Sequence, residues 1–310
     1  MKNYFLAGGM WAVLAAGGGM AFAAAATPPP VDRAAALAMS AAWNAPVPPR
    51  HLVGNIYYVG AMGVSSFLIT TPEGHVLLDT GLPATAPQIE RGVAELGFEL
   101  ADIKLILSSH AHFDHTGSHA TLQRLTGAKV VASAEDARVI ESGGADDFLP
   151  FPKDLAAYEA VKVDRIVADG ETVTLGGVTL TANVTPGHTR GATTWTMDVA
   201  EAGKTYRVVF YSSASINSGT RLTGPDAAYP GIDDDLASSL ARFKAMRCDL
   251  FFAPHGGQFG MMEKFARLDA GEKGVDVFAD PKGWAELIAG QEKAFRDLLA
   301  AERAEGASAK

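Results

Sequence analysis

Short apolar segments separated by turn residues dominate the hydrophobic pattern of this chain. Several of them alternate apolar and polar positions with the period of two that is typical of a β-strand, and Gly- and Pro-containing turns such as Thr71-Pro72-Glu73-Gly74 separate them. The pattern predicts strands at residues 52–59, 65–70, 75–79, 103–107, 130–131, 171–174, 178–184, 193–199, 206–211 and 250–252.

A period near 3.6 marks the predicted helices. In segment 84–96, for example, Ile89, Val93 and Leu96 fall on one face. The other predicted helices cover residues 117–125, 134–140, 234–246 and 284–303. The strands form two blocks, each accompanied by helices, which predicts an α/β (α+β) fold with two stacked sheets and helices on the outer faces. Without an internal repeat or a long linker, residues 26–310 are expected to form a single domain.

The first 25 residues have the pattern of a secretory signal peptide. Lys2 provides the positive start, an Ala- and Gly-rich apolar stretch follows to about residue 20, and Ala21-Phe22-Ala23 offers small residues for cleavage. A membrane anchor is the alternative, but no basic residues follow the stretch. We therefore expect a periplasmic protein without stable membrane association after cleavage. Segment 28–39, rich in Pro and Ala, is expected to be an extended or frayed lead-in.

Composition narrows the function classes. Of 310 residues, 48% are hydrophobic, which is ample for a buried core. The net charge of −9 and the absence of a basic block argue against nucleic acids and anionic membranes as partners. Cys248 is the only cysteine, so an intramolecular disulfide is excluded, and its apolar neighbours predict a buried, unreactive thiol. We expect a monomer.

The strongest chemical signal is the run from His110 to His115, directly after the predicted strand 103–107. It contains three imidazoles and one carboxylate within six residues. His110 and His112 alternate and can face one side, whereas Asp114 and His115 follow on a turn and point elsewhere. Such donors at a strand end are what a pair of divalent cations of intermediate softness requires.

Two further histidines occupy the same kind of position, a tight loop after a predicted strand. His188 lies in Pro186-Gly187-His188-Thr189, and His255 follows the strand at 250–252. The three other histidines lack this context and are expected at the surface or satisfied in the core; these are His51, His75 and His119.

Taken together, His110-x-His112-x-Asp114-His115, Pro186-Gly187-His188-Thr189 and His255 resemble the signature of the metallo-β-lactamase superfamily. Leu78-Asp79-Thr80-Gly81 looks like the turn below the metal loop of that family, and the likeness extends from about residue 43 to 300. The resemblance implies a four-layer αββα sandwich with two Zn²⁺ ions at one edge of the β-sandwich.

One position narrows the resemblance further. Related thioesterases, nucleases and lactonases place a metal-bridging aspartate at the end of the strand that here reads 208–213, and one β-lactamase subclass places a cysteine there. This chain has Ser213. The remaining donors resemble those of class B, subclass 3 metallo-β-lactamases, although Arg190 replaces a common proline. The resemblance implies that His110, His112 and His188 bind the first zinc and that Asp114, His115 and His255 bind the second.

The implied activity is hydrolysis of the β-lactam amide bond of penicillins, cephalosporins and carbapenems, and hence antibiotic resistance. In this reading a zinc-bound hydroxide attacks the carbonyl, and Asp114 belongs to the catalytic centre. Ser213 and Ser215 match positions that contact the substrate carboxylate in this subclass; the alternative is that their hydroxyls satisfy local backbone groups. Asp79 is the best candidate to orient the His-rich loop. A surface role is expected for Arg221.

Two alternatives stay open. One is a periplasmic thioester or lactone hydrolase of the same fold, against which the missing bridging aspartate argues. The other is a non-enzymatic zinc-binding protein, against which the six intact ligands argue. Segment 143–154 has no clear period and is expected to expose Phe148, Leu149 and Phe151, either covering the active site or docking onto the body of the protein.

Overall fold

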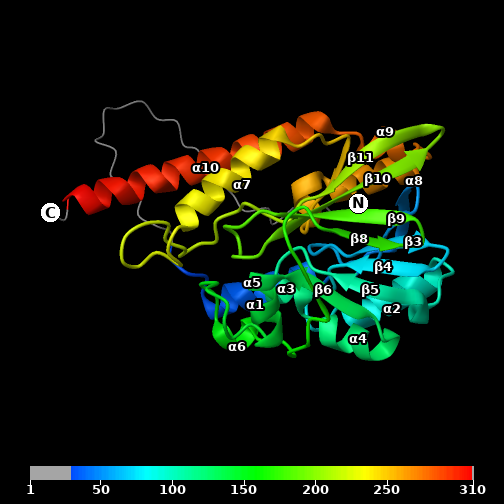
Figure 1. Ribbon diagram of the computed structural model, residues 1–310, viewed down its shortest axis with the longest axis horizontal. Helices are drawn as coiled ribbons and strands as arrows, with labels where there is room; N and C mark the ends of the chain where they lie inside the picture. Colours follow the sequence, from blue (N-terminus) through cyan, green and yellow to red (C-terminus); the bar gives the residue numbers. More distant parts are fainter. Residues whose placement is uncertain (1–28, 309–310) are drawn as a thin grey trace, which may run out of the picture.

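The computed structural model describes residues 29–308 and shows two β-sheets stacked face to face with helices on both outer sides (Figure 1). This confirms the four-layer αββα sandwich. The predicted signal peptide, residues 1–25, lies outside the described residues. Within residues 29–308, no helix is both long and apolar enough to cross a membrane.

The first sheet has seven strands in sequential order. They are β1 (Arg50–Val53), β2 (Ile56–Tyr58), β3 (Phe67–Thr71), β4 (Gly74–Leu78), β5 (Ile103–Leu107), β6 (Lys129–Ser133) and β7 (Arg165–Val167). Strands β1 to β4 pair antiparallel, and β4 to β7 pair parallel. The helices and the short 3₁₀ segment of this half are α1 (Arg33–Trp43), α2 (Ala86–Glu95), η1 (Leu100–Asp102), α3 (Phe113–Thr116), α4 (His119–Thr126), α5 (Ala134–Glu141) and α6 (Lys153–Ala156).

The second sheet has five strands in the order β12-β11-β10-β9-β8. They are β8 (Thr172–Leu175), β9 (Val178–Val184), β10 (Thr193–Glu201), β11 (Lys204–Phe210) and β12 (Leu250–Phe252). Its helical elements are α7 (Ile232–Ala245), η2 (Gly256–Phe259), α8 (Met261–Asp269), α9 (Gly274–Phe278) and α10 (Pro281–Ser308). Helices α7 and α10 run side by side across its outer side (Figure 1).

Alternating side chains along the strands divide the apolar residues between two cores. In β4, Val76 and Leu78 belong to the large core shared by both sheets, whereas Leu77 belongs to a second core with residues of α2, α4 and α5. Trp195 of β10 is fully buried in the large core, and its Nε1 donates a hydrogen bond to the carbonyl of Ser108 (2.9 Å). This bond joins the second sheet to the chain that leaves β5 toward the histidine-rich loop.

The structure corrects several expectations from the sequence. Segment 28–39 is not an extended lead-in, because α1 begins at Arg33: Asp32 accepts a hydrogen bond from the Ala35 amide (2.9 Å), and the Ala-rich run favours a helix. Predicted strand 52–59 is two strands, separated by a turn in which Gly54 has a φ of +54°. Strand β7 and helices α8 and α9 were not predicted.

Cys248 is partly rather than fully buried. Burial, together with the charges of Asp249 and Asp280, raises the pKa of its thiol to about 12. A thiol that stays protonated is a poor nucleophile, which agrees with the expected unreactive role.

Candidate metal centre

The candidate donors lie in loops that follow strands of both sheets. The chain leaving β5 carries His110 to His115, the β9–β10 loop carries His188, and His255 follows β12. Helix α3 begins immediately after His112, so Asp114 and His115 lie on one helical turn rather than on the preceding extended segment. This change of backbone direction separates the donors of the run into two sets.

The six predicted ligands come together in two groups of three. Within each group the donor atoms all lie within 4.8 Å of one another. The first group is His110, His112 and His188, and the second is Asp114, His115 and His255. This is the division that the resemblance implies, and either group could hold one metal ion.

Hydrogen bonds orient three of the imidazoles. Nδ1 of His188 lies 2.7 Å from the carbonyl oxygen of Ser215, and Nδ1 of His255 lies 2.9 Å from that of Gly63. Nδ1 of His110 lies 3.1 Å from Oγ of Ser109. Because a carbonyl only accepts, the first two rings carry their proton on Nδ1 and leave Nε2 as a lone pair.

Several buried nitrogens in the centre have no hydrogen-bond partner among residues 29–308. The clearest is Nε2 of His110, whereas Nε2 of His115 has only its ion-pair contact with Asp114. Buried polar atoms are almost always satisfied in folded proteins. Nitrogens without partners, in groups whose donors converge, are therefore the arrangement expected of metal ligands.

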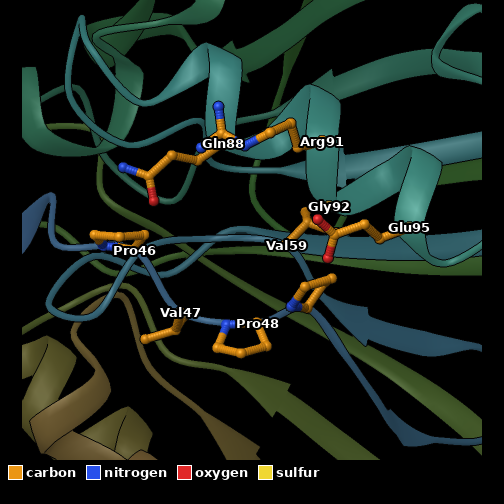
Figure 2. Close-up of a pocket in the computed structure, with 9 residues that line it drawn as sticks. Pro46, Val47, Pro48, Val59, Gln88, Arg91, Gly92 and Glu95 are labelled. Atoms are coloured by element: carbon orange, nitrogen blue, oxygen red, sulfur yellow. The ribbon is translucent and has the colours of Figure 1, made fainter.

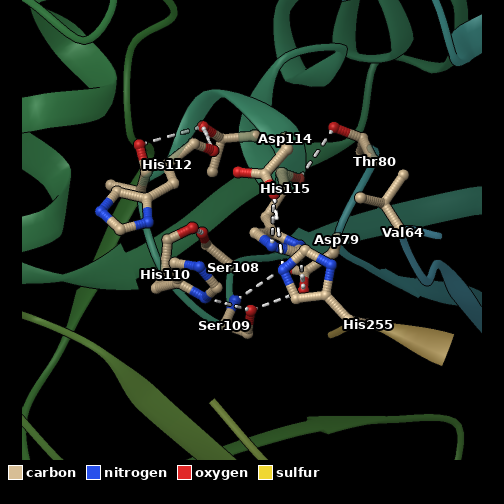
Figure 3. A network of polar contacts seen from close by, with 12 residues as sticks. Val64, Asp79, Thr80, Ser108, Ser109, His110, His112, Asp114, His115 and His255 are labelled. Carbon is tan, nitrogen blue, oxygen red and sulfur yellow. Dashed lines mark hydrogen bonds and ion pairs between the residues drawn. The ribbon is translucent and has the colours of Figure 1, made fainter. Parts of the chain in front are cut away.

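Asp79 follows β4, and its carboxylate accepts hydrogen bonds from Ser109 at the start of the histidine-rich loop (Figure 3). Its Oδ1 accepts from the amide of Ser109 (2.7 Å) and its Oδ2 from the Ser109 hydroxyl (2.5 Å). The same Oδ2 lies 3.8 Å from Nδ1 of His115. Asp79 has a φ of +59°, in the left-handed region that Asp tolerates better than most residues. These contacts are those that a residue orienting the loop would make.

Burial controls the protonation of the centre. It lowers the pKa values of His112 and His255 to about 4 and those of His110 and His188 well below the usual range. These four imidazoles are therefore neutral at pH 7, the form that binds a metal.

The pair Asp114 and His115 has the opposite behaviour, since Oδ2 of Asp114 lies 3.2 Å from Nε2 of His115. Burial alone would raise the pKa of Asp114, but His115 and the neighbouring imidazoles bring it well below its usual range. Burial opposes protonation of His115, yet Asp114 and Asp79 raise its pKa above the usual value. Asp114 is therefore an ionised ligand at neutral pH.

A cavity of about 250 Å³ opens onto both groups. Besides donors of the two groups, its walls contain Val31, Met39, Trp43, Phe113, Leu149, Pro150, Phe151, Ser215, Ile216, Asn217 and Ser218. The Trp43 ring lies 5.1 Å from that of His255, so α1 forms one wall. Sequence reasoning missed this wall because segment 28–39 was expected to be frayed.

Segment 143–154 both docks onto the body and lines the cavity. Leu149 is buried, not exposed as expected, and the ring of Phe151 lies 4.9 Å from that of Phe113. Phe148 packs on Tyr229 at 5.3 Å. The segment therefore combines the two alternatives that the sequence left open, since it docks onto the body of the protein and also lines the cavity at the candidate metal centre.

The two serines occupy different environments. Ser215 lines the cavity, whereas Ser213 is buried and its hydroxyl lies 2.9 Å from that of Ser215. The Ser213 oxygen also accepts from the Ser215 amide (3.1 Å). Of the two predicted substrate contacts, only Ser215 is placed at the cavity wall, and Ser213 lies where it supports Ser215. The substrate role of both stays a prediction.

Two positioning residues escaped sequence reasoning. Buried Asp136 of α5 accepts from the Thr189 hydroxyl and the Gly191 amide, both at 3.0 Å, and so fixes the loop that carries His188. The Tyr158 hydroxyl donates to the carbonyl of Ala111 (2.8 Å), between two of the histidines. The sequence signal that could have identified Asp136 is its position as an acidic residue on the apolar face of the predicted helix 134–140.

The three remaining histidines are outside the centre, as expected. His119 is buried, with Nδ1 2.7 Å from the Thr80 hydroxyl, and His51 contacts the carbonyl of Gly54 (2.8 Å). The buried ring of His75 packs edge-on against Phe98. Arg221 pairs with Glu305 (3.1 Å) and does not line the cavity.

A separate cavity of about 280 Å³ lies between α2 and the segment containing Pro46 (Figure 2). Its wall includes Gln88, whose Nε2 donates to the carbonyl of Asn44 (2.7 Å). It contains no group of metal donors. The hydrogen bond between Gln88 and Asn44 anchors the C-terminal end of α1, which places Trp43 next to the candidate metal centre.

Comparisons with known proteins agree with this geometry. A family model described as Metallo-beta-lactamase superfamily matches residues 59–255. The structure is similar to the native FEZ-1 metallo-beta-lactamase from Legionella gormanii, with a TM-score of 0.79 and 39% identity over 83% of this chain and 97% of that one. It is equally similar to BJP-1, a subclass B3 metallo-beta-lactamase of Bradyrhizobium japonicum, with a TM-score of 0.79 and 39% identity over 85% of this chain and 98% of that one.

Curated relatives are more distant. A metal-dependent hydrolase from Anaeromyxobacter sp. (strain K) is 28% identical over 67% of this chain and 68% of that protein. The chain spans between about one third and two thirds of the length of the curated relatives it matches first.

Proposed function

Since this chain belongs to the metallo-β-lactamase superfamily of metal-dependent hydrolases, we propose that it is a zinc-dependent β-lactamase of the B3 type. Its reaction is hydrolysis of the β-lactam amide bond of penicillins, cephalosporins and carbapenems, which would make it an antibiotic-resistance enzyme. The observation that carries the proposal is the composition of the two donor groups, five imidazoles and the single carboxylate Asp114.

The donors fit two zinc ions. Zinc prefers imidazole and carboxylate ligands in groups of three when one coordination position stays open for chemistry. The four neutral imidazoles, the ionised Asp114 and the unpartnered Nε2 of His110 suit that requirement. His115, whose pKa Asp114 and Asp79 raise in spite of its burial, would release a proton on binding the metal. When bound, two zinc ions would supply Lewis acidity toward a carbonyl oxygen and a water molecule that ionises near neutral pH.

The residues of the chain provide metal and substrate binding. The carboxylate of Asp114 stays ionised and faces the cavity, so it would help to hold the second metal ion next to the bound amide. Ser215 and Asn217 offer hydrogen bonds to the carboxylate that penicillins, cephalosporins and carbapenems share. Trp43 and Phe151 provide apolar walls for the fused ring.

A serine nucleophile is disfavoured by the same geometry. Oγ of Ser215 lies 3.3 Å from Nδ1 of His188, but that nitrogen already donates its proton to the Ser215 carbonyl. It therefore has no lone pair with which to accept the hydroxyl proton, and no covalent acyl-enzyme is expected.

The second candidate, thioester or lactone hydrolysis on the same fold, requires a different donor set in the relatives considered above. Their bridging aspartate stands at the end of the strand corresponding to β11, where this chain has the buried Ser213. Within residues 29–308, Asp114 is the only carboxylate in the two donor groups.

The test is a side-by-side assay of the purified mature protein. We expect a chromogenic cephalosporin and a carbapenem to be hydrolysed, activity to be lost with a chelator and restored by zinc, and a glutathione thioester and a lactone to react far more slowly. Asp114→Asn should weaken zinc binding by its group and lower turnover, while Asp146→Asn, which removes an exposed carboxylate nearby, should match the wild type. Chelator-resistant turnover, or thioester turnover exceeding that of both lactams, refutes the proposal.

We propose in addition that the protein is exported to the periplasm by residues 1–25. Sequencing the N-terminus of protein recovered from the periplasmic fraction should give a start near residues 24 to 26. Recovery of the full-length chain from the cytoplasm refutes this localisation.

A further inference from the structure

Three of the five histidines in the metal centre have a hydrogen-bond partner on the nitrogen that faces away from the ligand atoms. These partners were described above: Oγ of Ser109 and the carbonyls of Ser215 and Gly63. A fourth, His115, has no such hydrogen bond on Nδ1, but the carboxylate Oδ2 of Asp79 lies 3.8 Å from that nitrogen. An imidazole that binds a metal almost always donates its other N–H to such an acceptor.

The fifth histidine, His112, faces a carboxylate from a distant part of the sequence. Its Nε2 is buried and has no hydrogen-bond partner among residues 29–308. Oδ2 of Asp147 lies 3.6 Å away, and the side chains of the two residues are only 4% and 5% exposed. A shift of about half an ångström would make this contact a hydrogen bond.

We propose that Asp147 is the positioning carboxylate of His112, and that it couples segment 143–154 to the metal site formed with His110 and His188. By accepting the proton of Nε2, Asp147 keeps the lone pair of His112 on Nδ1, the ring nitrogen that is then free to act as the donor in the group with His110 and His188. The inference rests on the proposed dizinc function and adds a residue that the sequence did not indicate.

The position of Asp147 is set by its own segment. Its Oδ1 accepts from the Leu149 amide (3.0 Å), and its carbonyl accepts from Nζ of Lys153 (2.5 Å). Leu149 and Phe151, a few residues further on, form the cavity wall. The same short segment therefore lines the cavity and supports a candidate ligand, so a displacement of the wall also moves the acceptor of His112.

A matched control exists next to Asp147 in the sequence. Asp146 belongs to the same segment and has the same charge, but it is exposed and has no contact with a donor histidine. Comparing Asp147→Ala with Asp146→Ala separates the specific contact from the loss of one negative charge.

The experiment measures zinc binding to the purified mature protein by competition with a chromophoric chelator, and the absorption spectrum after cobalt(II) substitution. Asp147→Ala should weaken one of the two sites by about 10- to 100-fold and change the cobalt spectrum, whereas Asp146→Ala should leave both as in the wild type. Asp147→Asn, which keeps an acceptor but not the charge, should show a smaller loss. In a His112→Ala background, Asp147→Ala should have no further effect on that site.

The failures of the two proposals are distinguishable. A wild-type protein that binds no zinc refutes the dizinc function, and the role of Asp147 with it. A wild type that binds two zinc ions, with Asp147→Ala equal to Asp146→Ala, refutes the role of Asp147 alone. Equal losses at both sites, or an undiminished effect of Asp147→Ala in the His112→Ala background, also refute it. If Asp147→Ala does not fold, Asp147→Asn decides, and wild-type affinity and spectrum in that variant overturn the inference.

Discussion

Replacing Asp79 with asparagine should stabilise the metal-free protein at neutral pH and lower its affinity for zinc. Burial raises the pKa of Asp79 from 3.8 to about 6, although His115 and the hydrogen bonds from Ser109 act in the opposite direction. A carboxyl group with a raised pKa binds its proton more tightly in the folded state than in the unfolded state. The free energy of unfolding therefore falls as the pH rises from about 4 to about 6.

The magnitude follows from the size of that shift. Each pKa unit corresponds to about 1.4 kcal/mol, so the side chain of Asp79 costs roughly 3 kcal/mol more at pH 7 than at pH 4. The asparagine of the Asp79→Asn variant would be neutral at both pH values and would keep one acceptor for the Ser109 amide, which Oδ1 of Asp79 now accepts at 2.7 Å. Relative to the wild type, the variant should gain about 2 to 3 kcal/mol between pH 4 and pH 7.

The assay is urea unfolding of the metal-free wild type and the Asp79→Asn variant at pH 4 and pH 7, with linear extrapolation of the free energy of unfolding. Asp146→Asn serves as the control for removal of an exposed carboxylate, with an expected effect within about 0.5 kcal/mol at either pH. A difference between wild type and Asp79→Asn that is the same at both pH values would refute the reasoning.

Zinc binding completes the prediction, because the charge of Asp79 lies 3.8 Å from Nδ1 of His115. The variant should lose about 10- to 100-fold in zinc affinity at the site that contains His115, with a much smaller effect at the site of His112 and His188. Unchanged affinity at both sites would show that Asp79 supports only the backbone of the loop.

Three further predictions concern other parts of the molecule. Ser215→Ala should raise the KM for lactams that carry a carboxylate by about tenfold or more, with little change in kcat, because hydrogen bonds to charged groups contribute about 1.5–3 kcal/mol. An equal rise in KM for a lactam without the carboxylate would contradict the role of Ser215 in carboxylate binding. Trp195→Phe should lower the free energy of unfolding by about 1–3 kcal/mol, because the carbonyl of Ser108 loses its donor at 2.9 Å, and a change below about 0.5 kcal/mol would contradict it. Asp280→Asn should lower the melting temperature at pH 7, because Lys264 is buried 3.0 Å from Asp280. Burial opposes the charge of Asp280, but its partners lower its pKa below 3.8, so the difference in melting temperature between variant and wild type should disappear as the pH falls below about 4. A difference that persisted at lower pH would contradict this role of the ion pair.

The fold was largely predictable because local patterns agree with tertiary packing. Most predicted strands correspond to observed ones, since alternation along a strand reports directly which side chains face a core. The errors occur where another factor decides. Helix α1 depends on the cap that Asp32 provides and on the packing of its residues Met39 and Trp43 at the cavity. The break between β1 and β2 depends on the left-handed conformation of Gly54 within an apolar run.

The sequence by itself determined the chemistry of the centre. His110, His112, Asp114 and His115 are close in sequence, and the tight loops that carry His188 and His255 follow predicted strands. Residue type and strand ends are local properties, so the six candidate donors were accessible without coordinates, and the resemblance to the metallo-β-lactamase superfamily implied their division into the two groups that the structure brings together.

Only the tertiary structure decided which atoms hold those donors in place. The carbonyl of Gly63 lies 192 residues from His255 in the chain, and a carbonyl group is common to every residue type, so no sequence pattern identifies it as an acceptor. The approach of Asp147 to His112 likewise depends on how segment 143–154 packs against Phe113 and Tyr229. The type of each side chain can be read from the sequence. The orientation of an imidazole, in contrast, depends on which atoms the packed sheets bring next to its non-ligating nitrogen.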